Sequence, residues 1–176
     1  MTDEHKGGIE QWIQIVKEHP DNSRILLNDK DEMVGFWDFV TLFEDEYKKA
    51  KAGQLNDCEL TVEIMPPMIP GTYNIYFASI CLKENYKKTL ALQKLLISML
   101  NVFEELALNG VFIDEICTWA YTDSGIALSK ALGLKYHVEH KEHGKIFYTT
   151  MIDLLKQPLS KKFKTLKVMY NQYFKI

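Results

Sequence analysis

Apolar residues recur along the first third of the chain with a period that switches between helical and extended. Residues 9–16 carry Ile, Trp and Val at helical spacing, and His19-Pro20 ends that pattern. Residues 24–27 and 33–42 are rich in β-branched and aromatic side chains and are separated by the turn-forming residues 28–31. The pattern predicts a helix followed by a β-hairpin.

The middle of the chain contains the strongest signals. A charged helix is expected over residues 43–52 and a strand over 59–65, before a proline-rich break at 66–71. Residues 73–82 contain hardly a charge, which predicts a central strand buried on both faces. Residues 90–108 carry an apolar stripe of period 3.6 that stops at Asn109-Gly110, so they predict a long helix against the sheet.

The last third predicts a strand over residues 113–120, a short helix over 124–132 that ends at Gly133, and a hairpin over 135–151. Pro158 fits the first turn of a final helix. Its apolar stripe consists of Leu159, Phe163, Leu166, Tyr170, Tyr173 and Phe174. Such a stripe must be covered, either by the sheet or by a second copy of the chain in a homodimer.

The length of 176 residues indicates one domain, because domains commonly contain about 100–200 residues. We divide it into an N-terminal helix (1–22), a core (23–151) and a C-terminal amphipathic helix (152–176). Hydrophobic residues make up 47% of the chain, which is typical of a globular protein.

The charge distribution argues against DNA binding. The net charge is −3, and only residues 153–176, with six Lys and one Asp, are basic. Arg24 is the only arginine, so bidentate recognition of phosphates or bases is not built in. The lysine-rich side of the last helix leaves association with anionic lipid or RNA as a weaker hypothesis.

Cysteine and histidine patterns predict no metal site. Cys58, Cys81 and Cys117 lack the spacing of a zinc site and are expected to be reduced. His137, His140 and His143 fall on different sides of a hairpin, so they do not converge. The first residues lack an apolar leader, and the sequence has no apolar run of 18 residues. We therefore expect a cytoplasmic protein with no integral membrane segment.

The strand, turn and long helix of residues 77–96, with the Leu-Gly-Leu end of a later helix at 129–134, resemble the GNAT family of acyl-CoA-dependent N-acyltransferases. The resemblance runs from about residue 24 to 151. It implies an α/β (α+β) fold with a mixed, mostly antiparallel sheet of about six to seven strands flanked by helices. It also implies acetyl-CoA or another acyl-CoA as co-substrate, without a metal.

In the family, small residues at the start of the long helix let backbone N–H groups approach the pyrophosphate. Here either Lys87 or Tyr86 stands at the basic position of that motif, and large side chains replace most of the glycines. The resemblance implies that the backbone of Ile80, Cys81 and Leu82 aligns the pantetheine arm. It also implies that the pyrophosphate is bound by Lys87, Lys88, Thr89, Leu90, Ala91 and Leu92.

The resemblance places Ser129 where many family members carry the tyrosine that protonates the CoA thiolate, and Thr122 where an asparagine meets pantetheine. A serine hydroxyl is a weaker acid than tyrosine, so Tyr121 is an alternative donor. Glu63 is the candidate general base. The aromatic residues Trp37 and Phe39 are candidates for an acceptor pocket, and we expect Cys81 to be a small buried thiol rather than a nucleophile.

Two functions follow from the sequence. The first is an N-acetyltransferase that moves an acetyl group to an amine by direct attack. The acceptor stays open among aminoglycosides, polyamines, peptide N-termini and lysine. The second is a catalytically inactive GNAT-fold module for binding or oligomerisation, suggested by the altered motif positions.

Overall fold

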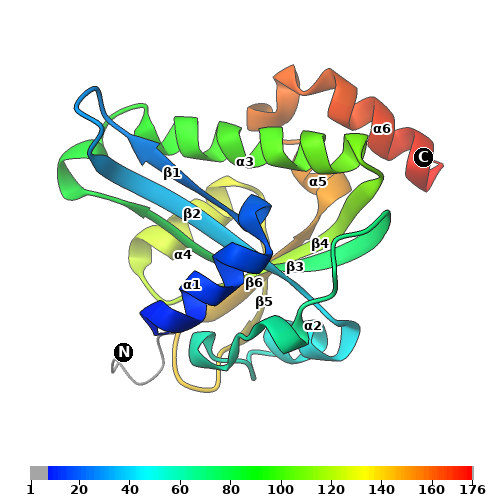
Figure 1. The fold of residues 1–176 in the computed structure, drawn as a ribbon, viewed down its shortest axis with the longest axis horizontal. Coiled ribbons are helices and arrows are strands. Elements are labelled where there is room, and N and C mark those ends of the chain that lie inside the picture. The colour runs from blue at the N-terminus through cyan, green and yellow to red at the C-terminus, as the bar shows by residue number, and fades with distance from the viewer. Residues whose placement is uncertain (1–7, 176) are drawn as a thin grey trace.

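The computed structural model describes residues 8–175. The prediction that the chain lacks an apolar leader was made from its first residues, and residues 1–7 lie outside the described range. A six-stranded sheet has the order β1-β2-β3-β4-β6-β5, with β3 and β4 parallel and every other neighbouring pair antiparallel (Figure 1). The strands are β1 (Ser23–Leu27), β2 (Met33–Leu42), β3 (Gly71–Leu82), β4 (Val111–Ala120), β5 (Lys135–Glu139) and β6 (Lys145–Thr150). The predicted mixed, mostly antiparallel sheet is confirmed.

The α-helices are α1 (Ile9–Glu18), α2 (Glu44–Lys51), α3 (Ala91–Leu108), α4 (Asp123–Ala131), α5 (Met151–Leu155) and α6 (Lys164–Phe174). Short 3-10 helices are η2 (Pro20–Asn22), η3 (Asp57–Glu59), η4 (Val62–Ile64), η5 (Glu84–Tyr86) and η6 (Pro158–Lys162). One face of the sheet packs against α3, α5 and α6, and the other packs against α1 and α2 (Figure 1). The sheet therefore separates two apolar layers.

The strand β3 contains one extra residue relative to β2. From the pair Asp38–Ser79 to the pair Val40–Tyr76, β2 advances by two residues and β3 by three. Side chains alternate between the faces of a strand, so an extra residue reverses that alternation. Phe77 and Ile80, which are three positions apart, therefore both pack on the α3 side.

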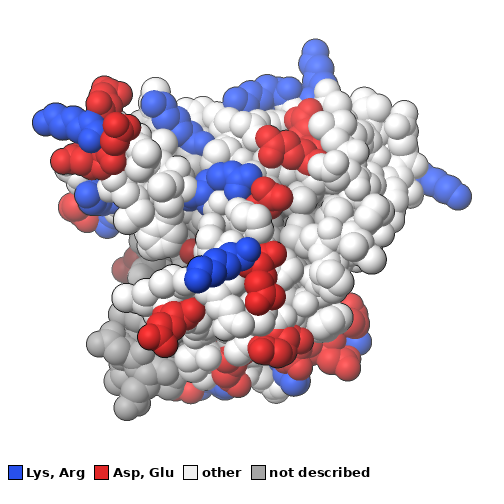
Figure 2. Space-filling model, in the orientation of Figure 1, with Lys and Arg blue, Asp and Glu red and all other residues white. Residues whose placement is uncertain are grey.

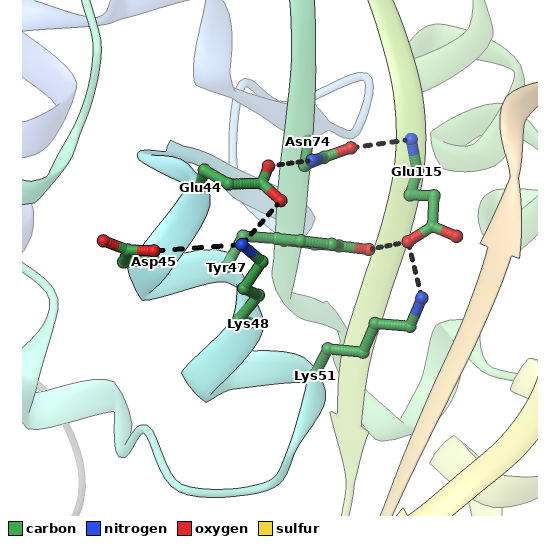
Figure 3. A network of polar contacts seen from close by, with 7 residues as sticks. All are labelled: Glu44, Asp45, Tyr47, Lys48, Lys51, Asn74 and Glu115. Carbon is green, nitrogen blue, oxygen red and sulfur yellow. Dashed lines mark hydrogen bonds and ion pairs between the residues drawn. The ribbon is translucent and has the colours of Figure 1, made fainter.

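The strand β4 is irregular too, and a polar network occupies the irregularity (Figure 3). The backbone N–H of Glu115 donates to Oδ1 of Asn74 on β3, at 3.2 Å. The Glu115 carboxylate accepts hydrogen bonds from Tyr47 Oη at 3.2 Å and from Lys51 Nζ at 2.7 Å, both on α2. These contacts fix α2 on the sheet, and α2 leads into the segment that carries η3.

Two element predictions are wrong. Residues 59–65 do not form a strand; their backbone turns through η3 and η4, and burial at Leu60 and Met65 lacks the two-residue period of a strand. The C-terminal segment is not one helix, because it forms α5, η6 and α6, with a break at Phe163. Its apolar stripe is mostly buried within the chain, with Leu166 and Tyr170 almost fully buried, so the stripe does not require a second copy.

The prediction that residues 73–82 are buried on both faces is also wrong beyond Tyr76. Only Ile75 and Tyr76 of β3 are buried, and the following residues are partly or fully exposed. These residues pack against the core on one side and border an opening in the sheet on the other. That opening is the candidate functional site.

Candidate functional site

The parallel strands β3 and β4 separate halfway along their length. Their pairing begins at Gly71–Val111 and ends at Tyr76–Cys117. Beyond that point β3 pairs only with β2, and β4 pairs only with β6. A cavity of about 310 Å³ opens between them, and we call it the β3/β4 cleft. It is lined by residues 77–82 of β3, residues 118–122 at the end of β4, five residues of α4 and its C-terminal end, and Lys87.

The β3 edge of the cleft presents backbone groups without a strand partner. The Lys83 N–H donates to the Val34 carbonyl at 2.9 Å, which continues the β2–β3 ladder. Successive residues of an antiparallel strand direct their backbone groups to opposite sides. The N–H and C=O groups of Leu82 and Ile80 therefore point away from β2 and toward the cleft. An extended, amide-containing ligand can pair with this edge as an added strand would.

The turn before α3 offers fewer donors than its length suggests. The N–H groups of Lys87 and Thr89 donate to the carbonyls of Glu84 and Tyr86, and the Ala91 N–H donates to the Thr89 hydroxyl. Among the described residues, the N–H groups of Lys88, Leu90 and Leu92 have no acceptor. Half of the six predicted donors are thus used inside the turn.

The large side chains that replace glycine in this turn do not enter the cleft. Leu90 is 68% exposed at the N-cap of α3, Ala91 is buried, and Leu92 packs against the core. Lys87 lines the cleft and pairs with Glu84 at 2.7 Å; both side chains are largely exposed, so the pair is weak. Lys88 is exposed next to it. Of the two predicted lysines, Lys87 is therefore the one that borders the cleft.

Three side chains near α4 were predicted to donate a proton or to contact pantetheine, and they differ in whether their hydroxyl groups are free to do so. Ser129 is buried, and its hydroxyl donates to the Gly125 carbonyl at 2.9 Å. Thr122 caps α4 by accepting from the Gly125 N–H at 3.0 Å. Tyr121 lines the cleft, is 39% exposed, and burial raises its pKa, so it keeps its proton at neutral pH. All three line the cleft, and of their hydroxyl groups only that of Tyr121 makes no hydrogen bond with another described residue.

The predicted base lies elsewhere. Glu63 is exposed on η4, and its pKa is lowered first by a hydrogen bond from Thr61; it does not line the cleft. The suggestion that Trp37 and Phe39 line an acceptor pocket is also wrong. Both are fully buried against α3, where the Trp37 Nε1–H donates to Ser98 Oγ at 2.7 Å. None of the three can contact a ligand in the cleft.

Two carboxyl groups that the sequence reasoning missed lie beside the cleft. Asp38 of β2 is 8% exposed, and burial raises its pKa to about 7, although hydrogen bonding to Ser79 lowers it in part. Burial also raises the pKa of Asp57 on η3 to about 6, while a hydrogen bond from the Tyr76 hydroxyl at 2.7 Å lowers it in part. A lone charge in the apolar strand 33–42 was the signal that could have indicated Asp38.

The cysteines and histidines have other roles. Cys81 is exposed in the cleft rather than buried as expected, and burial of part of its surface raises the pKa of the thiol. His140 stacks on Trp119, accepts from the Glu142 N–H at Nδ1, and therefore donates from Nε2 to the Leu55 carbonyl at 3.0 Å. No group of three or more potential ligands that could hold a metal occurs within residues 8–175.

A second cavity, of about 570 Å³, lies at the other end of α3. It is bounded by η2, by the segment around Met65 and Pro67, and by Leu106 and Asn109. It shares no lining residue with the β3/β4 cleft. No helix within residues 8–175 is long and apolar enough to cross a membrane. Basic and acidic side chains of the described residues are interspersed on the face shown in Figure 2.

No protein-family model matches the chain, and no curated protein matches it in sequence. Solved structures do match its architecture. A GNAT-like decarboxylase, GphF, in complex with isobutyryl-CoA is 13% identical, with a TM-score of 0.59 over 82% of this chain and 85% of that one. The chain has the GNAT fold.

Two further GNAT-fold matches have similar values. A chain of the NatC complex bound to Gag peptide and CoA is 12% identical, with a TM-score of 0.51 over 80% of this chain and 77% of that one. Naa50 from Arabidopsis thaliana, in complex with a bisubstrate analogue, is 12% identical, with a TM-score of 0.50 over 81% of this chain and 80% of that one. At identities this low, the structural similarity establishes the fold alone. Any statement about the reaction must be argued from the residues of the site.

Proposed function

We propose that this GNAT-fold chain binds an acyl-CoA in the β3/β4 cleft and transfers its acyl group to an amine. The observation that carries the proposal is the separation of β3 from β4 beyond Tyr76 and Cys117. The separation leaves the backbone groups of Ile80 and Leu82 free for the amide groups of a pantetheine arm. The neighbours described above, whose names include CoA or an acyl-CoA, support the choice of ligand.

The chain supplies binding and positioning groups for such a ligand. Lys87 and Lys88, with the N–H groups of Lys88, Leu90 and Leu92, suit the pyrophosphate at the mouth of the cleft. Tyr121 is the better proton donor for the departing thiolate, because the Ser129 hydroxyl is already bonded to a backbone carbonyl. Thr122 holds the N-terminus of α4 beside the cleft.

Isothermal titration with acetyl-CoA and with CoA tests the proposal. We expect binding of both, weakened about 3- to 30-fold by Lys87→Ala with Lys88→Ala, together with a smaller salt dependence. The matched control is Lys161→Ala with Lys164→Ala, two exposed lysines near the C-terminus, which should leave the affinity unchanged. Absence of binding at millimolar ligand would overturn the proposal.

Three of the six N–H groups expected to bind the pyrophosphate donate hydrogen bonds within the turn before α3. This loss of donors favours a second candidate, a GNAT-fold module without transfer activity. The two candidates differ in one measurement. The module releases no CoA thiol from acetyl-CoA in the presence of any amine, whereas the enzyme does.

A further inference from the structure

A buried carboxyl group with an unsatisfied oxygen lies on the face of the sheet that points away from α3, next to residues that line the cleft. Asp38 pairs across the strands with Ser79, and residues that pair directly project to the same face. Trp37 and Phe39 on either side of Asp38 pack against α3, so Asp38 projects to the opposite face. Its Oδ1 atom has no hydrogen-bond partner among the described residues.

Asp38 lies next to the cleft rather than inside a closed core. Ser79 and Cys81, which follow the extra residue of β3, both line the cleft. Cys81 interacts electrostatically with Asp38, and Tyr121 interacts with both Asp57 and Cys81. These interactions connect the two carboxyl groups to the end of the cleft where Tyr121 lies.

No cationic side chain of the described residues compensates this pair. Besides burial, the pKa of Asp38 is lowered by hydrogen bonds with Ser79 and raised by the negative charge of Asp57. The pKa of Asp57 is lowered by the hydrogen bond from the Tyr76 hydroxyl. A buried carboxylate without a cation is costly, and an alkylammonium ion supplies both the charge and three donors.

We infer that Asp38 binds the ammonium group of the acyl acceptor and takes a proton from it, on the face of the cleft opposite α3, with Asp57 and Tyr76 forming the adjoining wall. This inference rests on the proposed function and names the acceptor side of the same site. The class of acceptor is a small or flexible primary amine that is cationic in solution. A second carboxyl group close by favours a second cationic or donor group on that amine.

The acceptor ammonium gives one proton to the Asp38 carboxylate, and the neutral nitrogen attacks the thioester carbonyl carbon. The C–N bond forms as the C–S bond breaks. The departing thiolate takes the proton of the Tyr121 hydroxyl, and the nitrogen passes its second proton through solvent to the Tyr121 phenolate as the amide forms. Asp38 then releases its proton to solvent.

The experiment compares wild type with Asp38→Asn, using ethylenediamine and n-butylamine as probes and following release of CoA thiol from acetyl-CoA. We expect unchanged acetyl-CoA affinity by titration but at least a 100-fold lower amine-dependent kcat/KM. The rise of wild-type kcat/KM around pH 7 should be absent from the variant. Asp29→Asn, an exposed turn residue, is the matched control and should retain the wild-type profile.

Thermal unfolding with the amine alone, without CoA, tests the cation site separately. Ethylenediamine should raise the melting temperature of wild type more at pH 8 than at pH 5, and should not raise that of Asp38→Asn. If acetyl-CoA binds and the variant keeps both turnover and the amine effect, the inference is wrong and the proposed function stands. If acetyl-CoA does not bind but the amine effect depends on Asp38, the proposed function is wrong and the cation site stands.

Discussion

Replacing Asp38 by asparagine should stabilise the fold at neutral and alkaline pH. Burial raises the pKa of Asp38 from 3.8 to about 7, so between these values the folded chain holds a proton that the unfolded chain has lost. The free energy of unfolding must therefore fall as the pH rises through this window. Asparagine has no such proton and is free of this loss.

The size of the effect follows from the shift. One pKa unit corresponds to about 1.4 kcal/mol, so a rise from 3.8 to about 7 corresponds to about 4 kcal/mol at pH 8. Asparagine must also fit the place of the carboxyl beside Ser79, so we expect a net gain of about 2–4 kcal/mol. For a chain of this length that is a rise in melting temperature of roughly 5–15 °C.

The assay is thermal and urea unfolding of wild type, Asp38→Asn and Asp29→Asn at several values between pH 4 and pH 9. The two variants should differ little at pH 4, and the advantage of Asp38→Asn should grow up to about pH 7 and then level off. Stability curves for Asp38→Asn and wild type that run parallel across this range would refute the reasoning. A variant that gains stability and loses transfer would show that the carboxylate is kept for function.

Three further predictions concern the turn next to Tyr121, the hydrogen bond between Tyr76 and Asp57, and the ion pair that joins α2 to β4. Gly144→Ala should destabilise the fold by about 1–3 kcal/mol in urea, because Gly144 has φ +79° and an added Cβ would lie 2.8 Å from Tyr121 Cα; Gly8→Ala, with open space around it, is the control. Tyr76→Phe should raise the pKa of Asp57 further, seen by carboxyl NMR, because it removes the donor at 2.7 Å; an unmoved titration contradicts this. Lys51→Met should lower the free energy of unfolding in urea by about 1–3 kcal/mol, since Glu115 loses a largely buried ion-pair partner. Lys49→Met, on the exposed side of the same helix, should change it by less than about 0.5 kcal/mol.

The sequence predicted most elements correctly because their signals are local. The 3.6-residue stripe of α3 and the apolar run of β3 reflect burial that neighbouring residues determine together. The prediction for segment 59–65 failed because its apolar residues are buried in the cluster between the sheet, α1 and α2, without pairing as a strand. The final helix breaks at Phe163, where the side chain is buried in the core and the backbone leaves helical geometry.

The site was only partly predictable for a different reason. The sequence located the strand, turn and helix that border the cleft, and Tyr121 in its lining. An extra residue in a strand leaves no periodic signature in so short a segment, so the reversal of faces after Phe77 and the place of Ser79 beside Asp38 were not visible. Asp38 and Asp57 are 19 positions apart, and only the course of the segment after α2 brings them together.

The limited pairing of β3 with β4 divides the sheet into two three-stranded plates joined along the short stretch from Gly71 to Tyr76. The angle between the plates is therefore set by what packs across the joint, above all α3, α5 and α6 on one side. Substitutions in that packing will widen or narrow the gap without touching any residue that borders it. For the proposed acyl-CoA ligand, the length of acyl chain that fits then depends on the packing that holds the two plates together as well as on the side chains that line the cleft.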